Sequence, residues 1–345
     1  MKVKPFHQFI EKIRSNQIPF SVVFEITSRC NLSCLHCYQG KGRGELGLSK
    51  IKSTLDDLGQ TGCMKLTLTG GEPTLREDFL EIYSYSHRKG FAITLFTNGT
   101  LFNGDLRKKI LKEPPFVVEC SLYGASAKLH DSITQTEGSF EISLHNIKWM
   151  IEQGIRTTVK SVILSLNFHD IRSLYNLCSG LGVPFHPTYR VFPSMDPTRF
   201  PEKLRIKTEE MKTWLRETGN PFAKRIREPE SSSDSFICNA GREACCIGAE
   251  GKVYPCVALR WECGDLKKKD FPEIWAQSSV LQKIRSYKED DFHACFRCPW
   301  RADCNFCPGM GFSEHGDMLI PSKELCRITQ AMTKERAMSK QEGTD

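Results

Sequence analysis

The chain has 345 residues, of which 39% are hydrophobic and 26% are charged, and its formal net charge is +7 at pH 7. This composition indicates a globular protein, and no apolar run approaches the roughly 20 residues that a membrane-spanning helix needs. The first 17 residues carry frequent charges and no apolar core, so they are not a signal peptide and we expect a cytoplasmic protein. Because the basic excess is mild and spread along the chain, we expect neither nucleic acid nor a membrane as a partner.

Short runs of apolar, β-branched and aromatic residues predict six strands in the first part of the chain. These runs lie at 21–27, 65–70, 92–98, 116–123, 157–164 and 185–192. Helical patterns separate several of them, at 49–60, 77–90 and 139–154. Strands that alternate with helices form parallel sheets, so we expect either an open doubly wound sheet or a partial (β/α)6 barrel. In both folds ligands bind at the carboxyl ends of the strands.

The remaining segments suggest a second unit. Residues 21–200 form the predicted partial barrel, after an N-terminal extension at 1–20, and 201–237 read as a helix followed by a polar linker. Residues 238–326 hold most of the sixteen cysteines and show little strand–helix alternation, so we expect a small domain built around metal. Residues 327–345 read as a frayed helix or tail.

The cysteines point to metal rather than to disulfides, because a chain of this length without an export signal has no need of disulfides. Cys30, Cys34 and Cys37 directly follow the first predicted strand, with three and then two residues between them. A closed zinc or iron–sulfur site takes four ligands, whereas three thiolates leave one iron open for chemistry. A zinc site completed by His36 or a remote side chain is the alternative, and the triplet alone leaves both interpretations open.

The end of the second strand favours the iron–sulfur interpretation. Gly70, Gly71, Glu72 and Pro73 follow that strand directly. Two glycines let the backbone approach a ligand closely, and a carboxylate can accept a hydrogen bond from an ammonium group. A three-cysteine loop followed by this turn, in an array of strands and helices, resembles the radical S-adenosylmethionine (radical SAM) superfamily, and the resemblance covers nearly the whole chain.

The resemblance implies that the three cysteines hold a [4Fe–4S] cluster whose free iron chelates the amino and carboxylate groups of S-adenosylmethionine. One electron, from a donor such as flavodoxin or ferredoxin, then splits the cofactor into methionine and a 5′-deoxyadenosyl radical, which abstracts hydrogen from the substrate. The implied contacts of the cofactor are His36 beside the adenine, Gly70, Gly71 and Glu72 at the methionine moiety, Asn98 at the same mouth, Ser121 at the ribose, and Lys160 near a carboxylate.

A second cysteine pattern lies in 238–326. It reads Cys238-x12-Gly251-x4-Cys256, then Cys295-x2-Cys298-x5-Cys304-x2-Cys307, and ends with Cys326. In isolation this pattern would fit a pair of zinc ribbons. Beside the first triplet it resembles the SPASM extension of the superfamily, which carries two auxiliary [4Fe–4S] clusters and would bring the total to three.

By the same resemblance the two auxiliary ligand sets interleave. The outer cluster would be held by Cys295, Cys298, Cys304 and Cys326, and the inner one by Cys238, Cys245, Cys256 and Cys307, with Cys246 as the alternative to Cys245. The family has three residues before the last cysteine of the central run, whereas two precede Cys307 here. A cluster with four thiolates is suited to electron transfer, so the inner one would accept the second electron of a substrate oxidation. We expect the other cysteines to be small buried hydrophobic residues: Cys63, Cys120, Cys178, Cys246 and Cys263.

Proteins with this layout act mostly on peptides, so we expect a radical SAM oxidoreductase that oxidises or cross-links a ribosomally made peptide or a protein side chain. Val257 stands where sulfatase-maturing members have an aspartate base, which counts against that reaction. Only 29 residues precede Cys30, so a leader peptide would need a separate recognition protein or another surface. The alternatives are a small-molecule substrate, such as a haem precursor or a sugar-like metabolite, and a non-catalytic zinc-binding interaction module. The sequence names no general base or radical donor.

Overall fold

The structure is a computed structural model, and it describes residues 5–40, 42, 44–218 and 238–342. Six parallel strands follow one another along the chain, each beside its predecessor in the sheet. They are β1 (Ser21–Thr27), β2 (Lys65–Gly70), β3 (Ala92–Thr97), β4 (Val117–Ser121), β5 (Thr157–Val162) and β6 (Phe185–Thr188). All six strands were predicted, and the structure ends β4, β5 and β6 earlier than their apolar runs do.

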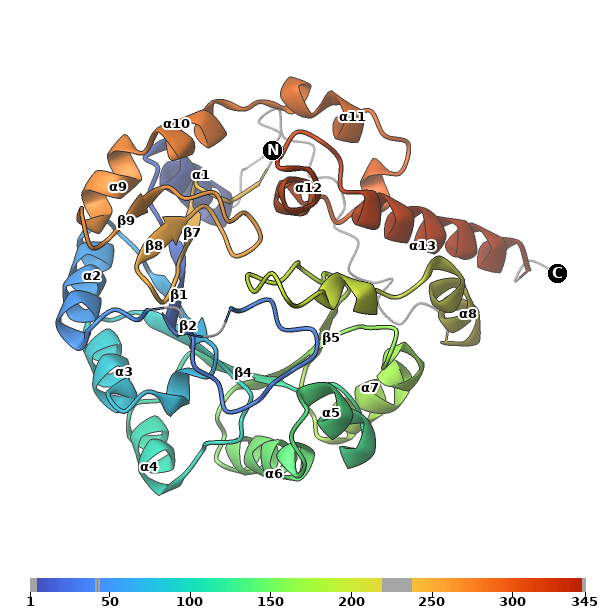
Figure 1. Ribbon diagram of the computed structural model, residues 1–345, viewed down its shortest axis with the longest axis horizontal. Coiled ribbons are helices and arrows are strands. Elements are labelled where there is room, and N and C mark those ends of the chain that lie inside the picture. The colour runs from blue at the N-terminus through green and yellow to red at the C-terminus, as the bar shows by residue number, and fades with distance from the viewer. Residues whose placement is uncertain (1–4, 41, 43, 219–237, 343–345) are drawn as a thin grey trace.

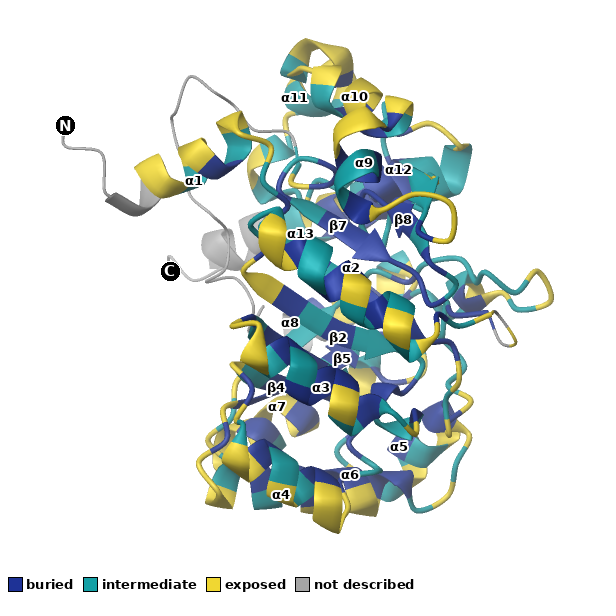
Figure 2. Ribbon diagram, turned by 90° about the vertical axis from the view of Figure 1, so that its left-hand side faces the viewer, coloured by how far each residue is buried: buried dark blue, intermediate teal, exposed yellow. Residues whose placement is uncertain are grey.

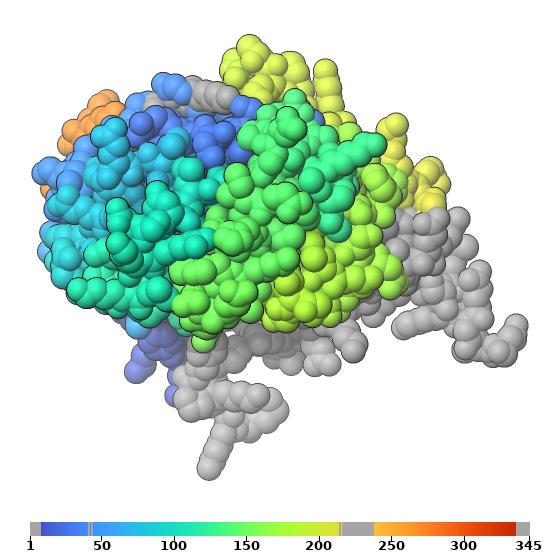
Figure 3. All heavy atoms as spheres, turned by 90° about the horizontal axis from the view of Figure 1, so that it is seen from below, coloured from blue at the N-terminus to red at the C-terminus, as the bar shows by residue number. Residues whose placement is uncertain are grey.

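A layer of helices surrounds these strands on one side (Figure 1). It consists of α2 (Leu48–Gln60), α3 (Phe79–Arg88), α4 (Gly104–Lys112), α6 (Ser139–Glu152) and α7 (Ile171–Gly180), with α5 (Ala127–Thr134) at the carboxyl end of β4. Seen from below, the segments between about residues 50 and 200 form most of the surface (Figure 3). The helices have exposed outer faces and buried inner faces, as amphipathic sequences require (Figure 2).

The two faces of the sheet differ in composition. In β1 to β4, the alternate apolar residues, such as Phe24, Leu68 and Val118, are buried in one hydrophobic core beneath the helices. The residues between them point to the opposite side, which we call the inner face; the part of it used below comprises Glu25, Thr67, Thr69, Phe96, Glu119, Ser121 and Lys160. Because helices cover only one face of a sheet that does not close, the fold is a partial barrel and not a doubly wound sheet.

The cysteine-rich segment extends the same sheet. Strand β7 (Ala244–Ile247) lies parallel to β1, and β8 (Lys252–Tyr254) and β9 (Gly264–Asp265) continue it antiparallel. The sequence did not predict these strands, because two to four residues are too few for a periodic pattern. The helices of this segment are α9 (Phe271–Gln277), α10 (Ser279–Ser286), α11 (His293–Phe296) and α12 (Pro308–His315). It also has a small apolar cluster of its own, around Leu259, Ile284, Phe292 and Met318.

The described part of the chain ends in a helix, which is one of the two alternatives expected for 327–345. Helix α13 (Lys323–Glu342) packs on α8 (Thr208–Thr218), and Arg327 donates hydrogen bonds to the Ile206 carbonyl at 2.6 Å and to Thr208 Oγ1 at 2.9 Å. The expected N-terminal extension contains α1 (Pro5–Ser15). The expected polar linker, at 228–235, lies outside the described residues. Within the described ranges, no helix has both the length and the apolarity to cross a membrane.

Candidate active site

The three cysteines of the first triplet lie together in the loop after β1. Burial raises the pKa of the Cys34 thiol most strongly, and the negative charges of Cys37 and Cys30 raise it further. The pKa of Cys30 rises to about 11, first through burial and then through the charges of Glu72 and Cys37. Three thiolates in such a place are unfavourable unless a metal centre compensates their charge, so this donor set suits a metal cluster.

Hydrogen bonds hold the loop across the mouth of the barrel. The Ser33 and Leu35 amides donate to the carbonyls of Thr134 and Ile133, at 3.0 Å and 2.9 Å. Arg199 donates to the Cys34 carbonyl from the other side. The middle of the loop is therefore fixed to the end of α5 and to the chain after β6.

Gly70 and Gly71 let the end of β2 lie directly against the start of the cysteine loop. A Cβ at Gly71 would lie 2.1 Å from the Arg29 carbonyl oxygen, and one at Gly70 would lie 2.1 Å from that of Thr27. The Gly71 amide donates to the Thr27 carbonyl, and the Glu72 amide to the Arg29 carbonyl, both at 2.8 Å. The sequence predicted that these glycines approach a ligand, and the structure adds a close approach to the protein's own backbone.

Glu72 joins the ends of β2 and β3. Its carboxylate is fully buried and accepts hydrogen bonds from Thr97 Oγ1 at 2.8 Å, from the Asn98 amide at 2.7 Å and from Thr74 Oγ1. Burial raises its pKa, and the hydrogen bonds oppose that rise. The Asn98 side chain in turn donates to Asn31 Oδ1 at 3.0 Å and lies 3.9 Å from Cys30 Sγ. Glu72 and Asn98 thus lie beside the first cysteine, as the resemblance implies.

His36 packs edge-on against Tyr123, with ring centroids 4.5 Å apart. Its Nδ1 is buried and has no hydrogen-bond partner within the described part of the chain. Burial, together with the charges of Arg199 and His130, lowers the pKa of His36 to about 4, so the imidazole is neutral near pH 7. A neutral ring with an unpaired nitrogen fits the expected place beside an adenine base.

Tyr123 is a site residue to which the sequence assigned no role. Burial raises its pKa, as do the charges of all three cysteines of the triplet, and its hydroxyl hydrogen-bonds to Ser121. Its amide donates to His130 Nδ1 at 3.1 Å, and the two rings are stacked 5.6 Å apart. Tyr123 could have been predicted as a site residue, because residues 121 and 123 share one face of the strand predicted at 116–123 and Ser121 was already assigned to the site.

The inner face of the barrel carries two ion pairs. Lys160 pairs with Glu119 and lies 4.1 Å above the Phe96 ring, and its register partner on β4 is Ser121. Arg260 pairs with Glu25, which is only 1% exposed. Tyr38, next to the third cysteine, donates to the same carboxylate at 3.0 Å. The structure therefore places Ser121 and Lys160 on the inner face, beside polar side chains that the sequence did not single out.

The four cysteines of the expected outer auxiliary set lie together. The pKa of Cys295 rises to about 11, first through burial and then through the charges of Cys326, Cys304 and Cys298. Cys295 lies in α11, Cys298 and Cys304 lie between α11 and α12, and Cys326 lies in α13. Residues up to 31 positions apart in sequence therefore meet in one place.

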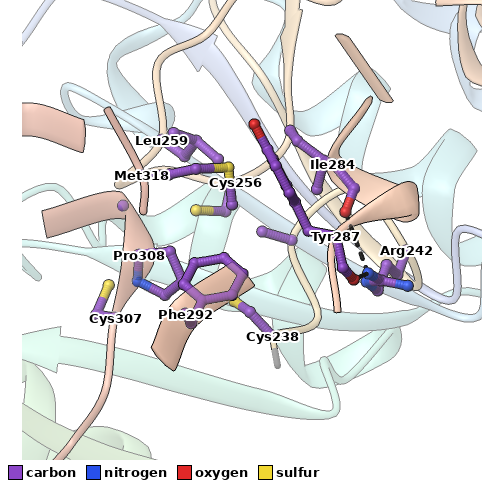
Figure 4. A pocket seen from close by; sticks show the side chains of 12 residues that line it. Cys238, Arg242, Cys256, Leu259, Ile284, Tyr287, Phe292, Cys307, Pro308 and Met318 are labelled. Atoms are coloured by element: carbon purple, nitrogen blue, oxygen red, sulfur yellow. Dashed lines mark hydrogen bonds between the residues drawn. The ribbon is translucent and has the colours of Figure 1, made fainter. Parts of the chain in front are cut away.

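Three cysteines of the expected inner set lie around one cavity (Figure 4). Burial raises the pKa of Cys256 to about 12, and the charges of Cys238 and Cys307 add to that rise. The fourth expected member, Cys245, lies elsewhere: it is buried in the core beneath the helices, where the charged groups that affect it include Cys63 and Cys263.

Across residues 5–40, 42, 44–218 and 238–342, no group of three or more His, Cys, Asp or Glu side chains is placed to hold one metal ion.

Comparisons with known proteins identify the class. Residues 24–178 match the family model of the Radical SAM superfamily, and residues 238–299 match the SPASM model, an iron–sulfur cluster-binding domain. The chain thus contains a radical SAM domain and a SPASM domain, and the predicted partial barrel is confirmed. These two domains support an enzyme that binds S-adenosylmethionine and iron–sulfur clusters, and they count against the zinc interaction module.

Several named proteins are similar to this chain over most of its length. The chain is 26% identical over 336 residues to the AdoMet-dependent heme synthase of Oleidesulfovibrio alaskensis, covering 88% of this chain and 86% of that protein. It is 25% identical over 316 residues to the mycofactocin maturase MftC of Mycolicibacterium smegmatis, covering 86% and 80%. The crystal structure of Streptococcus suis SuiB bound to S-adenosylmethionine is similar in fold, with a TM-score of 0.71 and 16% identity, covering 93% of this chain and 80% of that chain.

Proposed function

We propose that the chain binds S-adenosylmethionine at the carboxyl ends of β1 to β4 and uses it to oxidise a substrate that lies on the inner face of the barrel. The observation that carries the proposal is the gathering of three partly buried thiols, Cys30, Cys34 and Cys37, beside Glu72 and Asn98 at one mouth of the barrel. When bound there, a [4Fe–4S] cluster supplies the electron that cleaves the cofactor.

The chain's own residues would hold the cofactor and exclude water. The neutral His36 ring presents its unpaired Nδ1 to the adenine. The Ser121 hydroxyl, on the inner face, is available to the ribose in exchange for its bond to Tyr123. The methionine moiety would lie at the turn of Gly70, Gly71 and Glu72. Tyr123 belongs to an apolar cluster against which Cys34 packs, and this packing would help to keep water from the site.

The proposal is tested by reconstituting the protein with iron and sulfide under anaerobic conditions and measuring 5′-deoxyadenosine after reduction. Cys34→Ala should abolish its formation. Cys178→Ala removes a fully buried thiol from α7 and is the matched control, which should retain activity. No 5′-deoxyadenosine from the wild-type protein, or equal amounts from both variants, would refute the assignment of the site.

For the substrate we favour a haem precursor with carboxylate groups. The support is the inner face, where the cations of Lys160 and Arg260 are paired with carboxylates of the chain. Because an ammonium group has three N–H donors and a guanidinium group has five, Lys160 and Arg260 could bind a substrate carboxylate while they stay paired with Glu119 and Glu25. The heme synthase relatives, which cover 88% to 89% of the chain, point the same way.

Oxidation of a peptide is the second candidate, favoured by the similarity to mycofactocin maturase. It would involve a peptide partner and a separate protein that recognises a leader sequence. In either case an electron donor such as flavodoxin or ferredoxin would supply the reducing electron, and the second electron of the oxidation would leave through the auxiliary clusters of the SPASM domain.

Binding of an iron porphyrin distinguishes the two candidates. A porphyrin with free propionates should bind, as seen by a shift of its main absorbance band, and its methyl ester should bind more weakly. Lys160→Gln should weaken binding of the free acid about tenfold, which is about 1.4 kcal/mol, and leave the ester unchanged. Lys128→Gln, at an exposed position on α5, is the matched control. Absence of binding, together with a loss of two hydrogens from a short peptide encoded nearby, would favour peptide oxidation.

A further inference from the structure

Arg260 contacts both the loop of the first triplet and the cysteine-rich segment. Its Nε donates a hydrogen bond to the Val257 carbonyl at 3.1 Å, and Val257 directly follows Cys256. Its guanidinium carbon lies 5.5 Å from the centre of the Tyr38 ring, and Tyr38 directly follows Cys37. One side chain thus contacts a residue next to a cysteine of each of two expected clusters, the first one and the inner auxiliary one.

A buried carboxylate holds Arg260 in this place. Its Nη1 donates to Glu25 Oε2 at 3.1 Å, and its Nη2 donates to Glu25 Oε1, so the pair is bidentate. Glu25 is 1% exposed, and it also accepts a hydrogen bond from the Tyr38 hydroxyl at 3.0 Å. A bidentate pair fixes the position of a guanidinium group as well as its charge, which the single ammonium group of a lysine would not do.

The positive charge of Arg260 acts on a thiol that faces the inner auxiliary site. Cys246 lies on the inner face of β7, and burial raises its pKa. After burial, the charged groups that act on this thiol are, in decreasing order, Glu25, Arg260, Cys256 and Glu250. Arg260 is the one cation among these four groups, and it opposes the rise that the other three add.

Without Arg260, the charges in this place would oppose reduction of a cluster. Each added electron makes a cluster more negative, and the carboxylates of Glu25 and Glu250 disfavour that change, as do the thiolates. A cation fixed beside the cluster has the opposite effect, because it favours the more negative, reduced state. The net charge around a cluster is one of the properties that set its reduction potential.

We infer that Arg260 is a positioning residue of the inner auxiliary cluster, where its fixed charge raises the reduction potential so that the cluster accepts the second electron of the substrate oxidation. The inference rests on the proposed function, in which that electron leaves through the auxiliary clusters. The bidentate pair with Glu25 keeps the cation in place. The hydrogen bond that Glu25 shares with Tyr38 ties the same carboxylate to the loop of the first cluster.

The test measures the reduction potential of the inner cluster without substrate, in the triple variant of Cys30, Cys34 and Cys37 to Ala, which lacks the first cluster. The electron paramagnetic resonance signal that is lost in Cys256→Ala identifies the inner cluster. Arg260→Gln should make its reduction about tenfold less favourable, which lowers the potential by about 59 mV for one electron. Arg260→Lys keeps the charge and should lower the potential less than Arg260→Gln does.

Glu25→Gln separates an electrostatic role from a structural one. It removes an anion that acts on Cys246 and should raise the potential, whereas loss of structure would shift the potential of Glu25→Gln and Arg260→Gln in the same direction. Lys269→Gln is the matched control, because it removes a positive charge from an exposed ion pair of the same segment, where water and salt screen it. It should leave the potential unchanged.

The inference is wrong if Arg260→Gln leaves the potential of the inner cluster unchanged, or if Glu25→Gln and Arg260→Gln shift it in the same direction. If Arg260→Gln does not retain the cluster, the double variant Glu25→Gln/Arg260→Gln takes its place, because it leaves neither charge unpaired. The double variant should have a lower potential than Glu25→Gln alone, and an equal or higher potential would refute the inference. These potentials do not depend on cleavage of S-adenosylmethionine, so failure of the inference is distinguishable from failure of the proposed function.

Discussion

Gly71→Ala should disrupt the cysteine loop, although a methyl group is the smallest possible addition. The new Cβ would lie 2.1 Å from the Arg29 carbonyl oxygen, whereas Cβ atoms essentially never come within 3.0 Å of such an atom. The backbone must therefore move by at least 0.9 Å, the difference between these two distances, and no flexible side chain can absorb the change because the contact is with backbone.

The cost follows from the contacts that such a shift affects. Overpacking costs about 1–3 kcal/mol, and each of the two hydrogen bonds at 2.8 Å, from the Gly71 and Glu72 amides, contributes about 1 kcal/mol. We expect the free energy of unfolding of the metal-free protein to fall by about 3 kcal/mol. The displaced loop should also fail to assemble a cluster, with a loss of about four irons per chain after reconstitution.

Urea unfolding and iron analysis measure both effects, and Gly104→Ala is the matched control. Gly104 is at the first turn of α4, where a Cβ meets nothing within 4 Å, so alanine there should be neutral or stabilise the helix by up to about 1 kcal/mol. A Gly71→Ala protein with wild-type stability and a full complement of iron would refute the argument that the glycine is required by this close approach.

Three further predictions concern buried polar groups. Glu72→Gln keeps the shape of the side chain but turns an NH2 group toward hydrogen-bond donors. The free energy of unfolding should therefore fall by about 1–3 kcal/mol, and 5′-deoxyadenosine formation should drop. Unchanged values in both assays would contradict this role. Burial lowers the pKa of His130 from 6.5 to about 4, so its contribution to stability is complete above pH 6.5 and is lost as the pH falls toward 4. The urea midpoint, measured across that range, should therefore fall less steeply for His130→Gln than for the wild-type protein. Parallel curves would contradict the assignment. Arg260→Gln leaves the Glu25 carboxylate buried without its ion pair and should lower the free energy of unfolding by about 3–5 kcal/mol. The double variant Glu25→Gln/Arg260→Gln should recover part of that loss. A double-mutant cycle with no coupling would show that the pair does not stabilise the barrel.

The strands of the barrel were predictable because their signal is local. Buried strands such as β1 and β2 are short runs of β-branched and apolar residues, and the structure begins and ends both where the sequence predicted. The three-residue β8 and two-residue β9 were not predictable, because pairing with neighbours from other parts of the chain is what makes them strands.

The candidate site was predictable where residues close in sequence make it. The triplet of Cys30, Cys34 and Cys37 and the turn at Gly70 and Gly71 each lie within one short loop. The packing of Tyr123 between His36 and His130 depends on where α5 lies, and the hydrogen bond from Arg199 to the loop joins residues 165 positions apart. No local pattern encodes such contacts.

The sequence by itself determined the class of this protein, because cysteine spacing and strand–helix alternation are properties of short stretches of chain. Only the tertiary structure decided which thiols meet. Cys245 and Cys246 are adjacent, so in a strand they point to opposite faces, and which face looks toward Cys256 depends on how β7 pairs with β1, more than 200 residues earlier. That pairing is set by burial on both sides of the sheet, which the spacing of the cysteines does not encode. For this reason the spacing favoured Cys245 as a ligand, whereas the fold places Cys245 in the core.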